Sequence, residues 1–303
     1  MWDSPAAMRR LALVAALAAA LATVSASAAL AAPPAIGGCP VFPASNAWNR
    51  DISSAPVDPR SRRYVAAIGR GLKLHSDFGG AGAYEIPLTI VGPSQPLAPI
   101  TFTEAPDESD PGPYPVPLDA RVEGGSDRHV LVVQQETCKL LELFGARRSG
   151  DGWEAGSGAA FDLRTGALRP KGWTSADAAG LPIAPGLARA DEASAGPIQH
   201  ALRVTVPRSS RAFRAPARHY ASNSSDPDLP PMGLRLRLKK SYSLRGFHGQ
   251  SRAILTALRR YGLIVADNGS PWFISGAADD RWDDADLEQI KRVPGSAFEA
   301  VRP

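Results

Sequence analysis

"DRHVLVVQQETCKLLELFGARR", residues 127–148, is the stretch that decides the fold class of this 303-residue chain. It holds two apolar runs, "DRHVLVVQQ" and "CKLLELFGARR", with only Glu136 and Thr137 between them. Two strand-like runs separated by so short a connection predict a β-hairpin. The middle of the chain is therefore expected to be built from β-strands.

The same strand-like pattern recurs on both sides of this hairpin. Six further segments have it: "YEIPLTIVG" (84–92), "PITFTE" (99–104), "GWEAGSGAAFDLR" (152–164), "IQHALRVTV" (198–206), "RAFRAPARHYA" (211–221) and "MGLRLRLKKSY" (232–242). Many short strands with few helices between them predict one mainly β domain. A β-sandwich or jelly-roll-like body with a few peripheral α-helices is the expected architecture.

Four helices are expected on the periphery, and the last of them follows residue 282. "DPRSRRYVAAIG" (58–69) has Pro at its first turn and Gly at its end, and "GQSRAILTALRRYG" (249–262) has one apolar face and ends at Gly262. The first pattern predicts a short helix, and the second predicts an amphipathic helix. A third short helix is predicted to begin at Ser175 or Asp177, within a loop rich in Gly and Pro.

"GLIVADNGSPWFISGAADDRWDDADLEQI" (262–290) combines two strand-like runs with a crowd of aspartates. Asn268-Gly269 favours a tight hairpin turn with positive φ, so the two runs are predicted to pair. Asp283 or Asp284 is predicted to cap a following helix, which explains most of the acidic residues. The spacing lacks the alternating acids of a calcium-binding loop, so neither a metal nor another cofactor is expected.

The N-terminal end predicts export. Arg9 and Arg10 precede a long uncharged run of Ala and Leu that ends in small residues, as in a cleaved secretory signal peptide. We expect a signal peptide over residues 1–32, a proline-rich segment over 33–58 and a single β-rich domain over 59–303. The mature protein is expected to be secreted, with no stable membrane span after cleavage.

The only two cysteines, Cys39 and Cys138, predict a single disulfide. An even number of cysteines in an exported chain favours pairing, and so small a number with no close spacing disfavours a zinc site. The bridge would join the start of the mature chain to the second strand of the predicted hairpin.

The charge balance gives little indication of a nucleic-acid partner. The formal net charge is +4, and the most basic window, "GLRLRLKKSYSLR" (233–245), alternates Leu with basic residues. This pattern predicts a strand with one apolar face and one solvated basic face. No nucleic-acid binding is expected from so mild a charge.

Three long blocks, residues 172–206, 217–239 and 261–301, resemble a family of secreted bacterial proteins with no known activity. The resemblance extends over nearly the whole mature chain. It implies export and a single domain, and it supplies no catalytic residue.

Two histidines and two carboxylates are the candidate catalytic residues. His200 and His219 lie in strand-like segments separated by one predicted turn region, and Asp191 and Glu192 lie just before the first of them. If the strands are antiparallel neighbours, these side chains meet at one end of the sheet and can act as general acid and base. Structural anchoring of loops by the same histidines remains the alternative.

Asp162 and Asp267 are weaker carboxylate candidates for glycoside hydrolysis, since each is expected near a strand end.

Aromatic and basic residues near these positions are the candidate binding residues. They are Trp173, Tyr220, Trp272, Arg235 and Arg237. Aromatic faces on an exported β-rich protein are a common platform for sugars, and the arginines would suit an acidic glycan.

Two functions follow from these residues. The first is a secreted hydrolase that acts on extracellular polysaccharide or cell-envelope glycan by carboxylate and histidine chemistry, and it is slightly favoured because of the large loops. The alternative is a non-catalytic carbohydrate-binding or envelope structural protein. The sequence leaves open whether the protein is an enzyme.

Overall fold

The computed structural model describes residues 34–79 and 84–303, which belong to one unit running from Pro33 to Pro303. Its regular secondary structure is mostly strands, with few helices, so the predicted mainly β class is confirmed. Arrangement as a sandwich or jelly roll is not confirmed. The predicted signal peptide lies outside the described residues.

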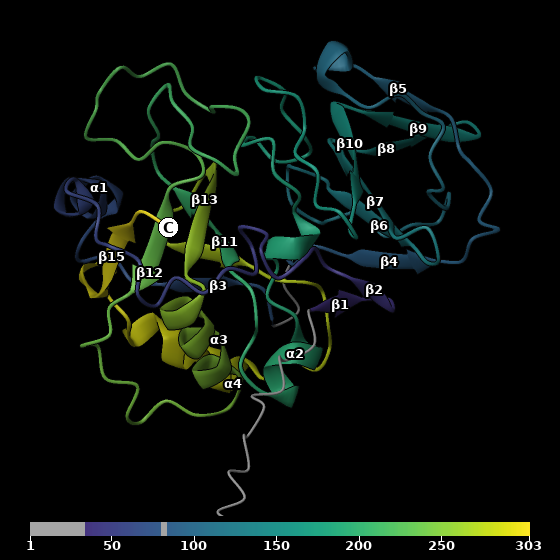
Figure 1. The fold of residues 1–303 in the computed structure, drawn as a ribbon. Coiled ribbons are helices and arrows are strands. Elements are labelled where there is room, and N and C mark those ends of the chain that lie inside the picture. Colours follow the sequence, from purple (N-terminus) through teal and green to yellow (C-terminus); the bar gives the residue numbers. More distant parts are fainter. Residues whose placement is uncertain (1–33, 80–83) are drawn as a thin grey trace, which may run out of the picture. The chain divides into compact units, whose positions relative to one another are not determined.

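The sheet with the most strands among the described residues is a mixed six-stranded sheet (Figure 1). Its strands, in spatial order, are β15 (Phe298–Val301), β12 (Arg235–Leu238), β13 (Leu263–Asn268), β11 (Leu202–Val206), β14 (Phe273–Ser275) and β3 (His75–Asp77). β11 runs parallel to β13 and antiparallel to β14. Both neighbours of β11 therefore come from the last third of the chain.

The predicted hairpin lies in a second, four-stranded sheet, where it is confirmed. This sheet has the order β10 (Ser157–Asp162), β7 (Lys139–Phe144), β6 (Val130–Gln134) and β4 (Leu88–Val91). β6 and β7 pair antiparallel from Val130↔Leu143 to Gln134↔Lys139.

Two smaller sheets and several short helices complete the fold. The smaller sheets are β5 (Ile100–Phe102) with β9 (Gly152–Ala155) and β8 (Arg147–Ser149), and β1 (Ala35–Ile36) with β2 (Cys39–Pro40). The α-helices are α1 (Ser61–Ile68), α2 (Ala190–Ala195), α3 (Gly249–Arg260) and α4 (Asp284–Leu287). The 3-10 helices are η1 (Pro106–Glu108), η2 (Ala184–Gly186), η3 (Glu288–Arg292) and η4 (Gly295–Ala297).

The four-stranded sheet is buried on both faces, which explains the continuous apolar runs of the hairpin. Leu131 and Val133 join the main core together with the six-stranded sheet. Val130 and Val132, which alternate with them, pack in a second core with Trp153 of the three-stranded sheet. Alternate residues of one strand thus serve two cores, as expected for a strand covered on both sides.

The helix boundaries follow the local signals. α1 begins after Asp58-Pro59 and is followed by Gly69 at a φ of 118°, and α3 is followed by Gly262 at 74°. Asp283 caps α4 by accepting a hydrogen bond from the backbone N–H of Asp286. Among the described residues, none of the helices has the length and apolar character needed to cross a membrane.

The predicted pairing of residues 263–267 with 272–276 is wrong. β13 and β14 do not pair with each other, because β11 lies between them. The segment from Gly269 to Trp272 instead crosses over the end of β11. The positive φ falls on Trp272, at 64°, and not on Gly269.

Three other local predictions differ from the structure. Ser175 and Asp177 form a turn in which the Ser175 hydroxyl accepts the Asp177 N–H, and the helix of this region comes later, as α2. The strand predicted over 152–164 is split into β9 and β10, which belong to different sheets. Residues 211–221 form no strand, and only Phe213 makes an isolated bridge there.

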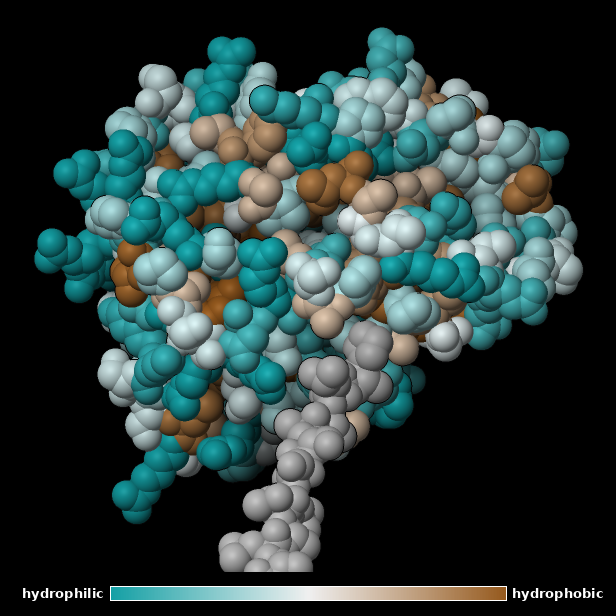
Figure 2. Space-filling model, in the orientation of Figure 1, coloured by the Kyte–Doolittle hydropathy of each residue, from teal (hydrophilic) through white to brown (hydrophobic). Residues whose placement is uncertain are grey.

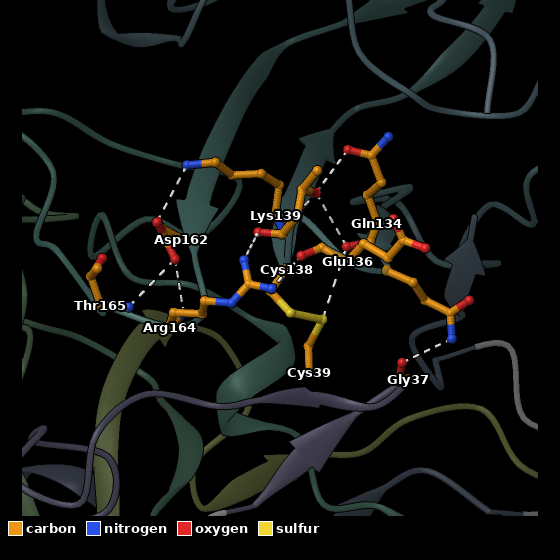
Figure 3. The surroundings of a disulfide bond; sticks show 11 residues. Gly37, Cys39, Gln134, Glu136, Cys138, Lys139, Asp162, Arg164 and Thr165 are labelled. Atoms are coloured by element: carbon orange, nitrogen blue, oxygen red, sulfur yellow. Dashed lines mark hydrogen bonds and ion pairs between the residues drawn. A yellow bond between two sulfur atoms is a disulfide. The ribbon is translucent and has the colours of Figure 1, made fainter. Parts of the chain in front are cut away.

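The proline-rich segment before residue 59 is packed into the same core as the rest of the chain. Ile36, Val41, Trp48 and Ile52 are all at most 3 % exposed. Cys39 and Cys138 form the predicted disulfide, which ties β2 to the start of β7 (Figure 3). The Arg164 side chain reinforces this junction by donating a hydrogen bond of 2.7 Å to the carbonyl oxygen of Thr137.

Candidate functional site

The structure brings together one predicted catalytic pair, Glu192 and His200. The Nε2 of His200 lies 3.0 Å from Glu192 Oε2, and its Nδ1 lies 2.8 Å from the carbonyl oxygen of Ala201. His200 is fully buried, and Arg189 also donates to Glu192. Burial raises the pKa of Glu192, but the charge and hydrogen bond of His200 outweigh it and hold that pKa below its ordinary value. Both imidazole nitrogens are occupied by protein groups, so this cluster anchors α2 to the start of β11.

His219 does not join this pair. The backbone N–H groups of Arg218 and His219 bond to Ala179, whose own N–H bonds to Ala266 of β13. Ala266 lies opposite the β-bulge between Val204 and Thr205 in the middle of β11, whereas His200 precedes the amino end of that strand. The ring Nδ1 of His219 lies 3.1 Å from the carbonyl oxygen of Ala178, and the ring nitrogens of His200 contact Glu192 and Ala201 instead. The expected assembly failed because residues 211–221 do not form a strand beside β11.

Two of the five predicted binding residues, Trp272 and Arg237, have structural contacts. Trp272 is fully buried and stacks on Phe298, with ring centroids 5.0 Å apart. Arg237 pairs with Glu299 and donates to the Ile52 carbonyl oxygen. Three other predicted site residues, Trp173, Tyr220 and Asp191, have different neighbours from one another. Trp173 lies beside Arg169, Tyr220 stacks on His219, and Asp191 is exposed next to Arg189.

Arg235 is the predicted binding residue that lines a cavity. The cavity has a volume of about 560 Å³ and lies where β12 meets several loops. Its walls come from six parts of the chain: residues 42–50, 161–169, 180–182, 214–216, 233–235 and 301–303. We call this cavity the arginine pocket.

The lining of the arginine pocket is largely apolar. Phe42, Trp48, Phe161, Leu168 and Leu181 contribute to its walls, together with alanines, glycines and prolines. Its polar side chains are one asparagine and five arginines, namely Asn46, Arg50, Arg169, Arg214, Arg235 and Arg302. No lining side chain is a carboxylate, imidazole, thiol, hydroxyl or amine, which are the side-chain groups that most often act as general acids and bases.

Two of these arginines are neutralised by acids. Arg169 pairs with Asp110 and also donates to the Glu108 carbonyl oxygen. Arg214 Nη1 lies 2.8 Å from Asp58 Oδ2, and its Nη2 donates to the Tyr64 hydroxyl.

Arg235 has no such partner. Its Nη2 donates to the carbonyl oxygen of Ala47 at 2.7 Å, while its Nε is buried and bonds to nothing among the described residues. The side chain is 4 % exposed. Burial, with the positive charge of Arg50, lowers the pKa of Arg235 to about 9. A positive charge in an apolar wall with no counter-charge is unfavourable unless something else supplies one.

A second polar cluster joins the six-stranded sheet to the loops around it. Arg203 of β11 pairs with Asp177 at 3.1 Å and donates to the Ser275 hydroxyl. Burial and the negative charge of Asp177 raise the pKa of Asp267 to about 7. Burial likewise raises the pKa of Asp177 against the opposing effect of Arg203. Asp177 is paired with Arg203, whereas Asp267 accepts a hydrogen bond from the Asn268 N–H. In the described parts of the chain no group of acids, histidines or cysteines could hold a metal ion.

Sequence reasoning missed most of the arginine pocket. The alternation of "RLRL" correctly placed Arg235 and Arg237 on one face of a strand, but that face is covered by residues 47–55 and is not solvated. Trp48 and Arg50 lie in the proline-rich segment, which was expected to precede the domain. No local pattern indicates that six distant segments meet at one cavity.

The face shown in Figure 2 has no broad apolar surface among the described residues, since brown residues are scattered between polar ones. Comparisons with protein-family models, with curated proteins and with solved structures found no match for this chain. The resemblance to secreted bacterial proteins therefore stays a prediction.

Proposed function

We propose that this protein is an exported binding protein that holds a small, largely apolar ligand in the arginine pocket without transforming it. The carrying observation is the pocket itself, an apolar cavity of about 560 Å³ with a few polar groups and no acid–base residue in its lining. Small-molecule sites are concave, mostly apolar and about 300–1,000 Å³ in volume. The Cys39–Cys138 disulfide and the basic-then-apolar start of the chain support export.

Binding is favoured over hydrolysis because the residues expected to catalyse hydrolysis are engaged elsewhere. Glu192 and His200 bond to each other, and His200 is fully buried. A neutral polysaccharide is the weaker candidate ligand, because a sugar needs many hydrogen-bonding partners and the lining offers only Asn46 and the arginines.

The experiment uses Nile red, a neutral dye whose fluorescence rises in apolar sites, with an obstructed variant. Ala167 lines the pocket and is exposed, so Ala167→Trp should fill the mouth without disturbing the core. Ala66→Trp, at an exposed position of α1 that does not line the pocket, is the matched control.

Wild-type protein is expected to bind one dye saturably. Ala167→Trp should weaken binding by about tenfold or more, equivalent to about 1.4 kcal/mol or more, and Ala66→Trp should leave it within about twofold. No saturable binding to the wild type, or equal binding to wild type and Ala167→Trp, would contradict the proposal.

A further inference from the structure

We infer that the ligand of the arginine pocket is an organic anion whose single acid group, a carboxylate, pairs with the Arg235 guanidinium. This inference rests on the proposed function and adds the chemical class of the ligand.

Comparison with the other buried arginines carries the inference. Five arginines of the described chain are at most 5 % exposed: Arg169, Arg189, Arg203, Arg235 and Arg237. Four of them pair with a carboxylate, which is Asp110, Glu192, Asp177 and Glu299 respectively. Arg235 is the exception among these residues, and the positive charge of another arginine, Arg50, acts on it.

The free hydrogen-bonding capacity of Arg235 fits a carboxylate. A guanidinium has five N–H donors, and a carboxylate can accept two of them side by side. The protein uses Nη2 for Ala47, and Nε is buried with almost no accessible surface, so Nη1 and the second N–H of Nη2 are the donors left for a ligand. Buried donors in folded proteins are nearly always bonded, so a guanidinium with a single hydrogen bond in a pocket wall points to a missing acceptor.

The surroundings favour one negative charge joined to an apolar body. Phe42, Trp48 and Leu181 line the same cavity as Arg235 and would contact the body of the ligand. Arg50 and Arg302 are exposed and form no ion pair with a described residue, so they add positive potential near the solvent. A single buried cation can neutralise a single acid group, whereas a dianion would bring a second charge into an apolar wall.

The test compares decanoate with decanol, which have the same chain length and differ in the charged head group. Each compound is titrated to displace Nile red from the wild-type protein, from the Arg235→Gln variant and from the control variant Arg62→Gln. Arg62 is an exposed arginine of α1, so its replacement changes the net charge by the same amount. At neutral pH, decanoate should displace the dye from the wild type at a concentration about tenfold or more below that of decanol, as expected for a charge-assisted hydrogen bond. Arg62→Gln should keep this preference, and Arg235→Gln should reduce it to within about threefold.

The stability of the ligand-free variants provides a second measurement. Arg235→Gln removes an unpaired buried charge and should leave the midpoint of thermal unfolding unchanged or higher. Arg237→Gln, two residues away on β12, leaves Glu299 without its partner and should lower the midpoint of thermal unfolding.

The outcomes separate the two claims. If Nile red does not bind the wild type, the proposed function fails. If Nile red binds but decanoate and decanol displace it equally, or if Arg235→Gln keeps the preference for decanoate, the pocket binds apolar molecules and the inference of an anionic ligand is overturned.

Discussion

The indole N–H of Trp272 donates a hydrogen bond of 2.8 Å to the carbonyl oxygen of Gly69, 203 residues earlier in the chain. Trp272 is fully buried, stacks on Phe298 and has a φ of 64°. A left-handed conformation costs a non-glycine residue about 1–2 kcal/mol, and burying so large an aromatic side chain outweighs that cost. This contact joins the loop after α1 to the loop that crosses over β11.

Trp272→Phe should lower the free energy of unfolding by about 1–3 kcal/mol. A smaller aromatic ring remains, but the partly buried Gly69 carbonyl loses the indole donor and keeps only the longer hydrogen bond from the Leu72 N–H. Trp272→Ala should cost about 3–5 kcal/mol, because it also leaves a cavity. Urea denaturation of the two variants measures both values, and an unchanged stability of Trp272→Phe would show that the hydrogen bond contributes nothing.

Removing the disulfide by the double substitution Cys39→Ala and Cys138→Ala should cost about 2–4 kcal/mol of stability, since the bridge closes a long loop in the unfolded chain. The two cysteines are 99 residues apart in sequence. A reducing agent should lower the unfolding midpoint of the wild type and leave that of the double variant unchanged. A wild type that is insensitive to reduction would contradict the prediction.

Glu142 should make stability fall as the pH rises toward neutrality. This carboxyl of β7 is fully buried and accepts hydrogen bonds from the backbone N–H groups of Ile183 and Ala184. Burial raises its pKa from 4.5 to about 7. Between these values the unfolded chain has released the proton that the folded protein retains, so the unfolded state binds fewer protons and stability decreases with pH. The full loss, reached above about pH 7, is about 3 kcal/mol.

Glu142→Gln should flatten this dependence while keeping an oxygen acceptor for the two N–H groups. Asp267, whose raised pKa has the same sign of effect, is present in both proteins and cancels in the comparison. Urea denaturation at pH 5 and pH 8 gives the two slopes. Parallel pH dependence in wild type and variant would mean that Glu142 is ionised throughout.

Glu192→Gln should destabilise the protein by about 3 kcal/mol, because it breaks a buried pair with His200 and Arg189 by removing one partner. Asp191→Asn is the matched control. Its carboxylate is 52 % exposed and lies 3.7 Å from Arg189, so it should change stability by about 0.5 kcal/mol or less. Nile red binding should persist in both variants. Loss of Nile red binding in Glu192→Gln, with unchanged stability, would show that Glu192 has a functional role and not only a structural one.

Local patterns predicted local structure well and long-range structure poorly. The hairpin of β6 and β7, the helices α1 and α3 and the Asp283 cap all depend on residues close together in sequence. The Asn268-Gly269 dipeptide has the composition of a hairpin turn, yet β11, some 60 residues earlier, lies between the strands that it connects. Strand order is decided by which distant apolar faces are buried together, and that information is not contained in a turn.

Of the residues that line the arginine pocket, the sequence predicted only Arg235 as a binding residue, because the pocket also depends on contacts between distant segments. The alternating pattern identified Arg235, but its environment is made by Ala47 and Arg50 from the opposite end of the chain. The predicted pair His200 and His219 depended on a strand over 211–221 that does not form. A hydrogen-bond partner for a histidine is easily found in the backbone, as Ala201 and Ala178 show, so a histidine in a strand-like segment is weak support for catalysis.

The strand order of the six-stranded sheet has a consequence for the timing of folding during synthesis. One edge strand, β3, is made early, and the opposite edge strand, β15, is made more than 200 residues later. The six-stranded sheet cannot be completed until residue 301 has left the ribosome, because β15 pairs last. Sheets dominated by such distant pairings fold slowly. Ribosome-bound chains that end at Lys291 should therefore be digested readily by protease, whereas released full-length protein should resist it. Resistance of the shorter chains would show that the sheet is stable without its last strand.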